Sequence, residues 1–191
     1  MAFVPLIGFA PDLDPTTPGI ITECDGWLPS PRGMHTHYTA EDADFAALDA
    51  ACKGLYVSRY NDGTTKTYAG TATKLYELSS GTWTDRSAGS GTYTSTTAWR
   101  WATVGNTTYV ASPYAKLSKA TTGAFATVST GGTDGPKAAT LCTSLGFLIA
   151  GNYDNGTAYP DGVYWSAINV PDDWRPDVAT QCGNINLRDT P

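Results

Sequence analysis

The sequence predicts an all-β fold in which short antiparallel strands form β-propeller-like blades behind an extended, proline-rich N-terminal arm. The main observation is a repeat, in which Tyr68 and Tyr109 are 41 positions apart and Leu75 and Leu117 are 42 apart. Glycine- and threonine-rich turns separate the strands of each copy, and a period in the forties with such turns is typical of propeller blades. Charged residues make up only 16% of the chain, below the average of about 25%, which favours a folded domain.

The arm spans residues 1–38 and is rich in both proline and apolar residues. Its prolines remove backbone donors and fix φ, so little regular structure is expected apart from a short strand at 19–24. An apolar segment of this kind is expected to lie on its own domain or on a neighbouring subunit. The side chains predicted to make inter-subunit contacts are Phe3, Leu6, Ile7, Phe9, Trp27 and Leu28.

Residues 39–53 are predicted to form a short helix or a loop. Thr39 is a candidate N-cap, and Phe45, Leu48 and Cys52 would form one apolar stripe on a helix. A loop with a single helical turn would give a similar pattern, so both alternatives stay open.

Residues 54–191 are predicted to form the blades. The expected blades span about 54–90, 99–130 and 138–178, and a further blade is expected to start at 184–191. An Asn-Asp-Gly sequence at 61–63 marks a tight hairpin turn in the first of them. Propellers close with about four to eight blades, so the propeller is expected to be incomplete. Either the chain belongs to a longer protein or a partner covers the open edge.

The repeat also predicts which side chains form the blade core and which remain available for contacts. Residues in phase with the repeat are expected in the core between blades: Trp83, Phe125, Trp174, Leu75 and Leu117. A possible contact surface is assigned to the remaining aromatic residues Trp99, Trp165 and Tyr159, which could stack on sugars. The four cysteines have no CxxC spacing and are interpreted as buried thiols: Cys24, Cys52, Cys142 and Cys182.

No set of residues with catalytic or metal-binding spacing is found. His35 and His37 would share one face of a strand, but no third ligand is nearby in the sequence. Residues 152–156 resemble a calcium loop only weakly, because the distal glutamate is missing. The Asp-box of sialidase propellers is also absent. We therefore expect no catalytic residue, no cofactor and no metal, and a protein that is not an enzyme.

The bulk properties restrict the partners. The net charge is −6 and the pI is about 4.7, so no basic stripe is available to bind phosphates. An acidic surface instead repels DNA that has to slide past it. No segment approaches the roughly 18 consecutive apolar residues of a membrane span, and the N-terminus lacks the basic start of a signal peptide. Synthesis in the cytoplasm is expected.

Several stretches together resemble the N-terminal part of the tail hub or nozzle proteins of short-tailed bacteriophages. They are Pro-Leu-Ile-Gly at 5–8, the Asp-Leu-Asp-Pro-Thr-Thr-Pro-Gly run at 12–19, Trp-Leu-Pro-Ser at 27–30, the blade segments 69–78 and 81–85, and the segments 179–182 and 187–191. The blade segments are the most specific. None of these motifs is catalytic, so the resemblance points to assembly.

This resemblance implies a structural protein of the virion tail. Its copies would form a ring, commonly of six, that continues the channel of the portal and adaptor, contacts tail fibre or spike proteins, and retains and then conducts DNA without specific binding. In such proteins the chain continues well beyond the point matched by residue 191. A carbohydrate- or receptor-binding module at the tail tip, using exposed aromatic residues, is the alternative.

Overall fold

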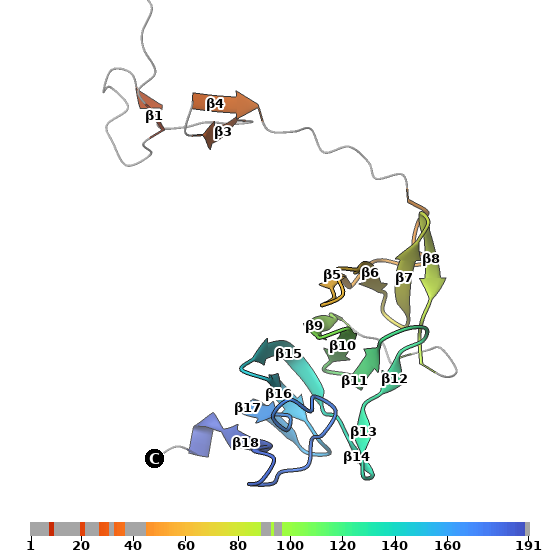
Figure 1. Cartoon of the computed structure of the whole chain (residues 1–191), viewed down its shortest axis with the longest axis vertical. Helices are drawn as coiled ribbons and strands as arrows, with labels where there is room; N and C mark the ends of the chain where they lie inside the picture. The colour runs from red at the N-terminus through yellow and green to blue at the C-terminus, as the bar shows by residue number, and fades with distance from the viewer. Residues whose placement is uncertain are drawn as a thin grey trace, which may run out of the picture. The chain divides into compact units, whose positions relative to one another are not determined.

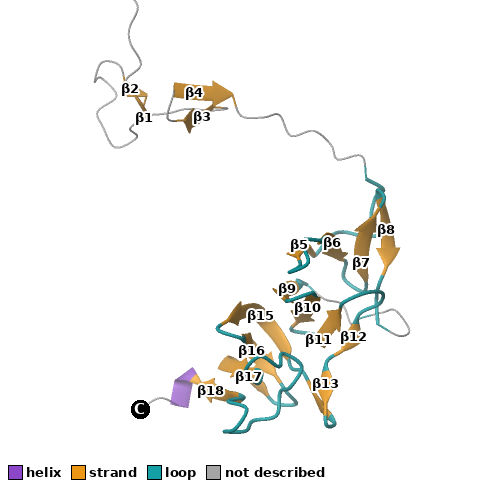
Figure 2. Cartoon of the chain, in the orientation of Figure 1, coloured by secondary structure: helices purple, strands orange, loops and turns teal. Residues whose placement is uncertain are grey.

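A computed structural model describes residues 45–88, 93 and 97–188 with their side chains, and residues 8–9, 20–21, 27–30, 33–36 and 189 as backbone. The chain divides into two compact units, Met1–Ala43 and Asp44–Pro191. The described residues are all-β, with mostly antiparallel sheets and one short 3₁₀ helix, η1 (Leu187–Asp189). The prediction of an all-β fold is therefore confirmed (Figure 2).

The first unit contains two small sheets. Strand β1 (Gly8–Phe9) pairs in parallel with β2 (Ile20–Ile21), and β3 (Trp27–Ser30) pairs antiparallel with β4 (Gly33–Thr36). Strand β2 lies inside the strand expected at 19–24. The β3–β4 hairpin is an addition to the extended arm that the sequence predicts. It is compatible with Pro29 because proline is tolerated at sheet edges.

Residues 45–53 form a loop, so the helical alternative does not describe this part of the segment. Its backbone donors bond to the neighbouring sheet: Ala46 N–H donates to Gly81 O (2.9 Å) and Lys53 N–H donates to Gly70 O (2.7 Å). These tertiary hydrogen bonds replace the i to i−4 bonds of a helix. Phe45, expected on an apolar helical stripe, is 53% exposed. Residues 39–44 lie outside the described residues.

The second unit contains three successive four-stranded meanders, which we call the first, second and third sheets. The first sheet consists of β5 (Gly54–Arg59), β6 (Thr65–Gly70), β7 (Leu75–Ser79) and β8 (Thr82–Asp85). The second consists of β9 (Arg100–Val104), β10 (Thr107–Ser112), β11 (Ala115–Ala120) and β12 (Ala126–Thr127). The third consists of β15 (Lys137–Ser144), β16 (Phe147–Asp154), β17 (Ala158–Trp165) and β18 (Gly183–Asn186).

Local turn chemistry explains these hairpins. Gly63, in the turn between β5 and β6, has φ +83°, a conformation that glycine adopts without strain. A small hairpin of β13 (Ser129–Thr130) and β14 (Thr133–Asp134) connects the second sheet to the third. The second and third sheets are also joined through one residue pair, Lys116 opposite Lys137, so they form a continuous eight-stranded sheet.

The prediction that residues 184–191 begin a further blade is wrong for the part of them that the structure describes. Strand β18 pairs antiparallel with β17, Val163 opposite Ile185, and so completes the third sheet. The long loop 166–182 returns the chain to this edge. Sequence spacing could not show this, because the fourth strand follows the third only after that loop.

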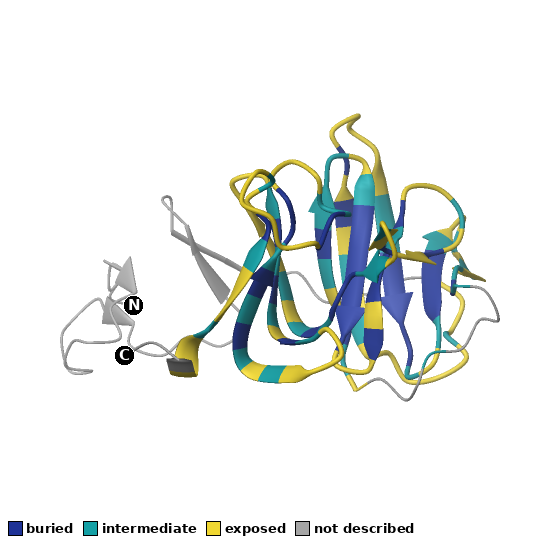
Figure 3. Ribbon diagram, turned by 90° about the horizontal axis from the view of Figure 1, so that it is seen from below, coloured by how far each residue is buried: buried dark blue, intermediate teal, exposed yellow. Residues whose placement is uncertain are grey.

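The three sheets lie one behind another along the unit (Figure 1), and their strands carry many of its buried residues (Figure 3). Two hydrophobic clusters lie between the sheets. One cluster, including Tyr68, Leu75 and Phe125, lies between the first and second sheets. The other, including Tyr109, Leu148 and Trp174, lies between the second and third. None of the sheets in the described residues closes on itself.

Candidate functional site

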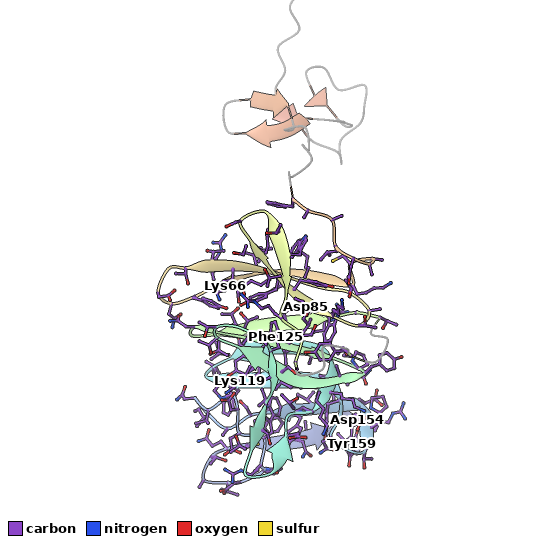
Figure 4. All side chains as sticks on the ribbon, turned by 90° about the vertical axis from the view of Figure 1, so that its right-hand side faces the viewer. Lys66, Asp85, Lys119, Phe125, Asp154 and Tyr159 are labelled. Atoms are coloured by element: carbon purple, nitrogen blue, oxygen red, sulfur yellow. The ribbon has the colours of Figure 1, made fainter. Side chains whose placement is uncertain are left out.

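The sheet faces are the most organised surfaces of this unit. Side chains alternate between the two faces of a strand, so each sheet has two faces. The forward face is the one directed along the stack from the first sheet toward the third, and the rear face is the opposite one. The forward face of the first sheet and the rear face of the second form an aromatic interface. Trp101 stacks on Tyr56 with ring centroids 6.0 Å apart. Phe125, labelled in Figure 4, meets Tyr68 edge-on at 5.4 Å.

A chain of hydroxyl groups crosses the same interface. Ser58 Oγ lies 2.5 Å from both Thr103 Oγ1 and Thr108 Oγ1, and Tyr60 Oη lies 2.9 Å from Thr108 Oγ1 and 3.0 Å from Tyr68 Oη. Buried hydroxyls need such partners. Burial, helped by Tyr60, raises the pKa of the Tyr68 phenol well above its usual value. The Tyr68 phenol therefore stays neutral, and the hydrogen-bonded hydroxyls hold the two sheets in register.

The second and third sheets are connected through loop 166–182. Asp172 of this loop accepts hydrogen bonds from Tyr109 Oη (2.9 Å) and from Lys119 Nζ, and its carbonyl accepts one from Thr130. Burial and the Asp172 carboxylate raise the pKa of Tyr109. Trp174 is fully buried and meets the ring of Tyr164 at 5.1 Å. No local sequence signal indicates that Asp172 would bond across the two sheets, because its partners lie 42 to 63 positions away.

Among the described residues of the second unit, two sheet faces pack against no other sheet. The rear face of the first sheet carries Leu55 (62% exposed) and Val57 (48% exposed) on β5, with Leu78 and Trp83 facing the same way on β7 and β8. Asp49 and Lys74 lie over Tyr76 and cover part of this face.

The other uncovered face is the forward face of the third sheet. Cys142, Ile149 and Trp165 stand in one row across β15, β16 and β17, and Val163 and Ile185 stand in the next row. Ile185 is 42% exposed, and Ile149, Val163 and Trp165 are half-buried. Both ends of the stack therefore present apolar strips.

The predicted core residues divide into two groups. Leu75, Leu117, Phe125 and Trp174 are each at most 2% exposed and belong to the two clusters between sheets. Trp83 is half-buried on the rear face of the first sheet and belongs to neither cluster. Its placement in the core is therefore wrong for the chain as described, because no sheet lies behind it.

The predicted contact surface also divides. Trp99 is only 2% exposed, so its assignment to a contact surface is wrong. Its ring lies over Gly70, where an added Cβ would come within 2.2 Å of Trp99 Cδ1, and its Nε1 donates to Thr71 O at 2.7 Å. Trp165 is half-buried and donates to Gln181 O. Tyr159 is half-buried and stacks on Tyr153 at 5.0 Å.

The arm residues are placed only in part. Phe9 lies in β1, and Trp27 and Leu28 lie in β3. Phe3, Leu6 and Ile7 lie outside the described residues, so the predicted inter-subunit contacts of the arm stay a prediction. The expectation that His35 and His37 share one face of a strand also stays a prediction. His35 lies in β4, and His37 is outside the described residues.

The cysteine prediction is wrong for two of the three cysteines whose side chains the structure describes. Cys182 is buried, and burial raises the pKa of its thiol to about 11. Cys52 and Cys142 are exposed free thiols. Cys142 is exposed because it lies on the uncovered face of the third sheet. Cys24 lies outside the described residues.

Two hollows border the third sheet, and the first of them is also lined by Lys116 of β11 and by the β13–β14 hairpin. One, of about 500 Å³, is bordered by the ion pairs Lys116–Asp134 (2.6 Å) and Lys137–Asp154 (3.1 Å). Each carboxylate is paired with a lysine. The hydrogen bond from Lys116 lowers the pKa of Asp134. The pKa of Asp154 is lowered first by the hydrogen bond from Gly156 N–H and then by that from Lys137. The other, of about 570 Å³, is bordered by Asp161 and Arg188, which form an ion pair. Paired charges of this kind are typical of a solvated surface.

The segment that resembles a calcium loop is an ordinary hairpin turn. Gly156 N–H donates to Asp154 Oδ1 at 2.8 Å between β16 and β17. Among the residues with described side chains, no three His, Cys, Asp or Glu come together as a metal-binding group. The part of the chain that the structure describes also has no helix with the length and apolar character needed to cross a membrane.

Comparison with known proteins finds no family model and no curated protein that matches this chain.

Proposed function

We propose that this chain is a non-enzymatic structural subunit of a bacteriophage tail, in the nozzle or hub ring that continues the portal and adaptor channel. The observation that carries the proposal is the stack of three meanders, each of four strands in chain order. We further propose that these meanders are β-propeller-type blades, since four-stranded meanders arranged around an axis define that architecture.

The use of the side chains supports a scaffold. Phe125 and Trp174, expected in the core, and Trp99, expected on a contact surface, are all buried between or beside the sheets. The buried hydroxyls of Ser58 and Thr108 bond to one another across an interface. A repeat whose aromatic and hydroxyl groups are used in this way builds a rigid body, and rigid bodies of repeated units are suited to assembly.

The charge supports a conduit for DNA. With a formal charge of −6, the subunit repels the phosphate backbone and offers no basic track to which DNA could bind. A ring of such subunits would let DNA pass without holding it. The partners in this role are further copies of the chain, the adaptor or portal, and tail fibre or spike proteins.

The test is location in the particle. An antibody raised against the expressed chain should label the tail of intact virions encoded by the same genome, and mass spectrometry of those virions should recover the chain in several copies. The expressed chain should not shift duplex DNA in a gel at about 0.15 M salt, where the Debye length is about 8 Å. Absence from purified particles would refute the proposal. Glycan binding that is lost in Trp165→Ala would instead favour the receptor-binding alternative.

A further inference from the structure

The two uncovered faces are the two halves of an interface that the molecule already contains. In the first and second sheets, Tyr68 and Tyr109 hold the same register position on the forward face. Ile149 holds that position on the third sheet, since it pairs with Cys142 as Tyr109 pairs with Ala102. The forward face of the third sheet is therefore built like the faces that, in the first two sheets, are covered by the next sheet.

Trp83 shows the same relation on the rear faces. It stands beside the Thr84–Glu77 pair of the first sheet, as Phe125 stands beside the Ala126–Lys119 pair of the second. Phe125 is 2% exposed because it packs on Tyr68 of the preceding sheet. Trp83 has no preceding sheet among the described residues and remains half-buried. A large aromatic side chain is thus presented where the repeat normally buries one.

Leu55 completes the correspondence. It lies on β5 at the position that Trp101 occupies on β9, next to the Tyr56–Tyr68 and Ala102–Tyr109 pairs respectively. Trp101 stacks on both Tyr56 and Tyr68, at 6.0 and 5.9 Å. On the third sheet, the positions of Tyr56 and Tyr68 are occupied by Cys142 and Ile149. A rear face with Leu55 and Trp83 therefore fits a forward face with Cys142 and Ile149.

We propose that a second copy of this chain docks head to tail on the third sheet, so that its Leu55 and Trp83 pack against Cys142 and Ile149. This inference rests on the proposed assembly role and assigns the face through which copies meet. Each copy carries one face of each kind, so two copies form two identical contacts. The described four-stranded sheets of two copies number six, within the range of about four to eight blades in which propellers close. Closure at two copies also prevents a head-to-tail contact from growing into a filament.

A second copy suits these faces better than an unrelated partner. The uncovered faces repeat the register and the apolar character of faces already packed within the chain, and the chain itself supplies both. Exposed apolar strips of this kind mark interaction surfaces. The apolar arm at residues 1–38 is the other occupant that the chain offers, and the experiments below distinguish it.

Sedimentation velocity of the full-length chain tests the proposal directly. The wild type should sediment as a dimer of roughly twice 20.2 kDa. Leu55→Lys places a charge in the contact and should weaken the dimer on the order of tenfold or more. Leu145→Lys is the matched control, because Leu145 is 90% exposed in the β15–β16 turn and stands in neither apolar row of the third sheet. It should leave the dimer unchanged.

Cross-linking tests which faces meet. Packed sheets are about 10 Å apart, so the probe is a bis-maleimide of about that reach, used on Leu55→Cys with Cys24 and Cys52 replaced by serine. It should give a covalent dimer that is lost when Cys142→Ser is added. The control carries Val178→Cys in place of Leu55→Cys, at a residue that is 95% exposed in loop 166–182. It should give no covalent dimer.

Each outcome has one meaning. A concentration-independent monomer, or a dimer that Leu55→Lys does not weaken, would overturn the inference. An intramolecular cross-link to Cys24 of the arm, sought in Leu55→Cys with Cys24 kept and only Cys52 replaced by serine, would also overturn it. The proposed tail function is judged separately, from the presence of the chain in virions. A chain found in virions without the Cys142 cross-link would keep the function and reject this interface.

Discussion

Replacing Phe125 by alanine should lower the free energy of unfolding by about 3–5 kcal/mol. The ring is 2% exposed, and burying a phenylalanine side chain contributes about 1.5–3 kcal/mol. It also makes edge-on contacts with Tyr68 (5.4 Å) and Trp101 (6.0 Å), each worth about 0.5–1.5 kcal/mol. The surrounding sheets are held by hydrogen bonds and cannot collapse fully into the space that the ring leaves.

Trp83→Ala is the matched comparison, because Trp83 holds the same position in the repeat as Phe125. Tryptophan is the larger side chain, so sequence reasoning alone would predict the larger loss. Trp83 is half-buried and lacks a sheet behind it, so its removal should cost the monomer only about 1–2 kcal/mol. The smaller side chain should therefore show the larger effect.

Urea unfolding followed by tryptophan fluorescence measures both changes, at protein concentrations at which the chain sediments as a monomer. With m of about 1–3 kcal/mol/M, Phe125→Ala should lower the midpoint by more than 1 M. If that variant does not fold, Phe125→Leu keeps most of the volume and should cost about 1–2 kcal/mol. Equal losses for Trp83→Ala and Phe125→Ala would refute the reasoning, because they would mean that both positions are equally buried.

Three further predictions concern other contacts. Gly70→Ala should destabilise the fold by about 1–3 kcal/mol in urea unfolding, since the new Cβ would lie 2.2 Å from Trp99 Cδ1; an unchanged midpoint would contradict this packing. Arg175 holds the pKa of Asp173 below its usual value, so Asp173→Asn should cost about 1–3 kcal/mol at pH 7. The cost should shrink as the pH falls from about 4 through the lowered pKa, because the wild-type carboxylate then becomes protonated; a pH-independent cost would contradict it. Burial raises the pKa of Cys182 to about 11, so iodoacetamide at pH 8 should modify it only after unfolding in urea, and rapid modification of the folded chain would contradict that.

Several parts of the fold could be predicted from the sequence because they depend on local chemistry. The turn at 61–63 and the strands around Tyr68 and Tyr109 follow from turn residues and a repeated pattern. The burial of Leu75 and Leu117 follows from their repeat phase, and both are at most 1% exposed. In each case the interacting residues are close in the sequence or recur at a fixed interval.

The remaining features depend on contacts between distant residues. Trp99 lies just before β9, and its burial is determined by Gly70, which leaves room for the ring. Strand β18 joins the third sheet only because loop 166–182 returns to its edge. Residues 45–53 carry a helical pattern but bond to the first sheet. Propensity is a weak signal in such places, and tertiary hydrogen bonds override it.

The difference between Trp83 and Phe125 shows what a repeat can and cannot predict. A repeat specifies the position of a side chain within its own sheet, whereas burial depends on whether another sheet lies against that face. Within the described residues, the same position is covered in the second sheet and uncovered in the first. The uncovered position is occupied by a large apolar side chain, Trp83, which is only half-buried within the described residues. Exposed apolar side chains lower solubility unless they are covered in an assembly, so the repeat phase of Trp83 and its incomplete burial together point to docking on another sheet.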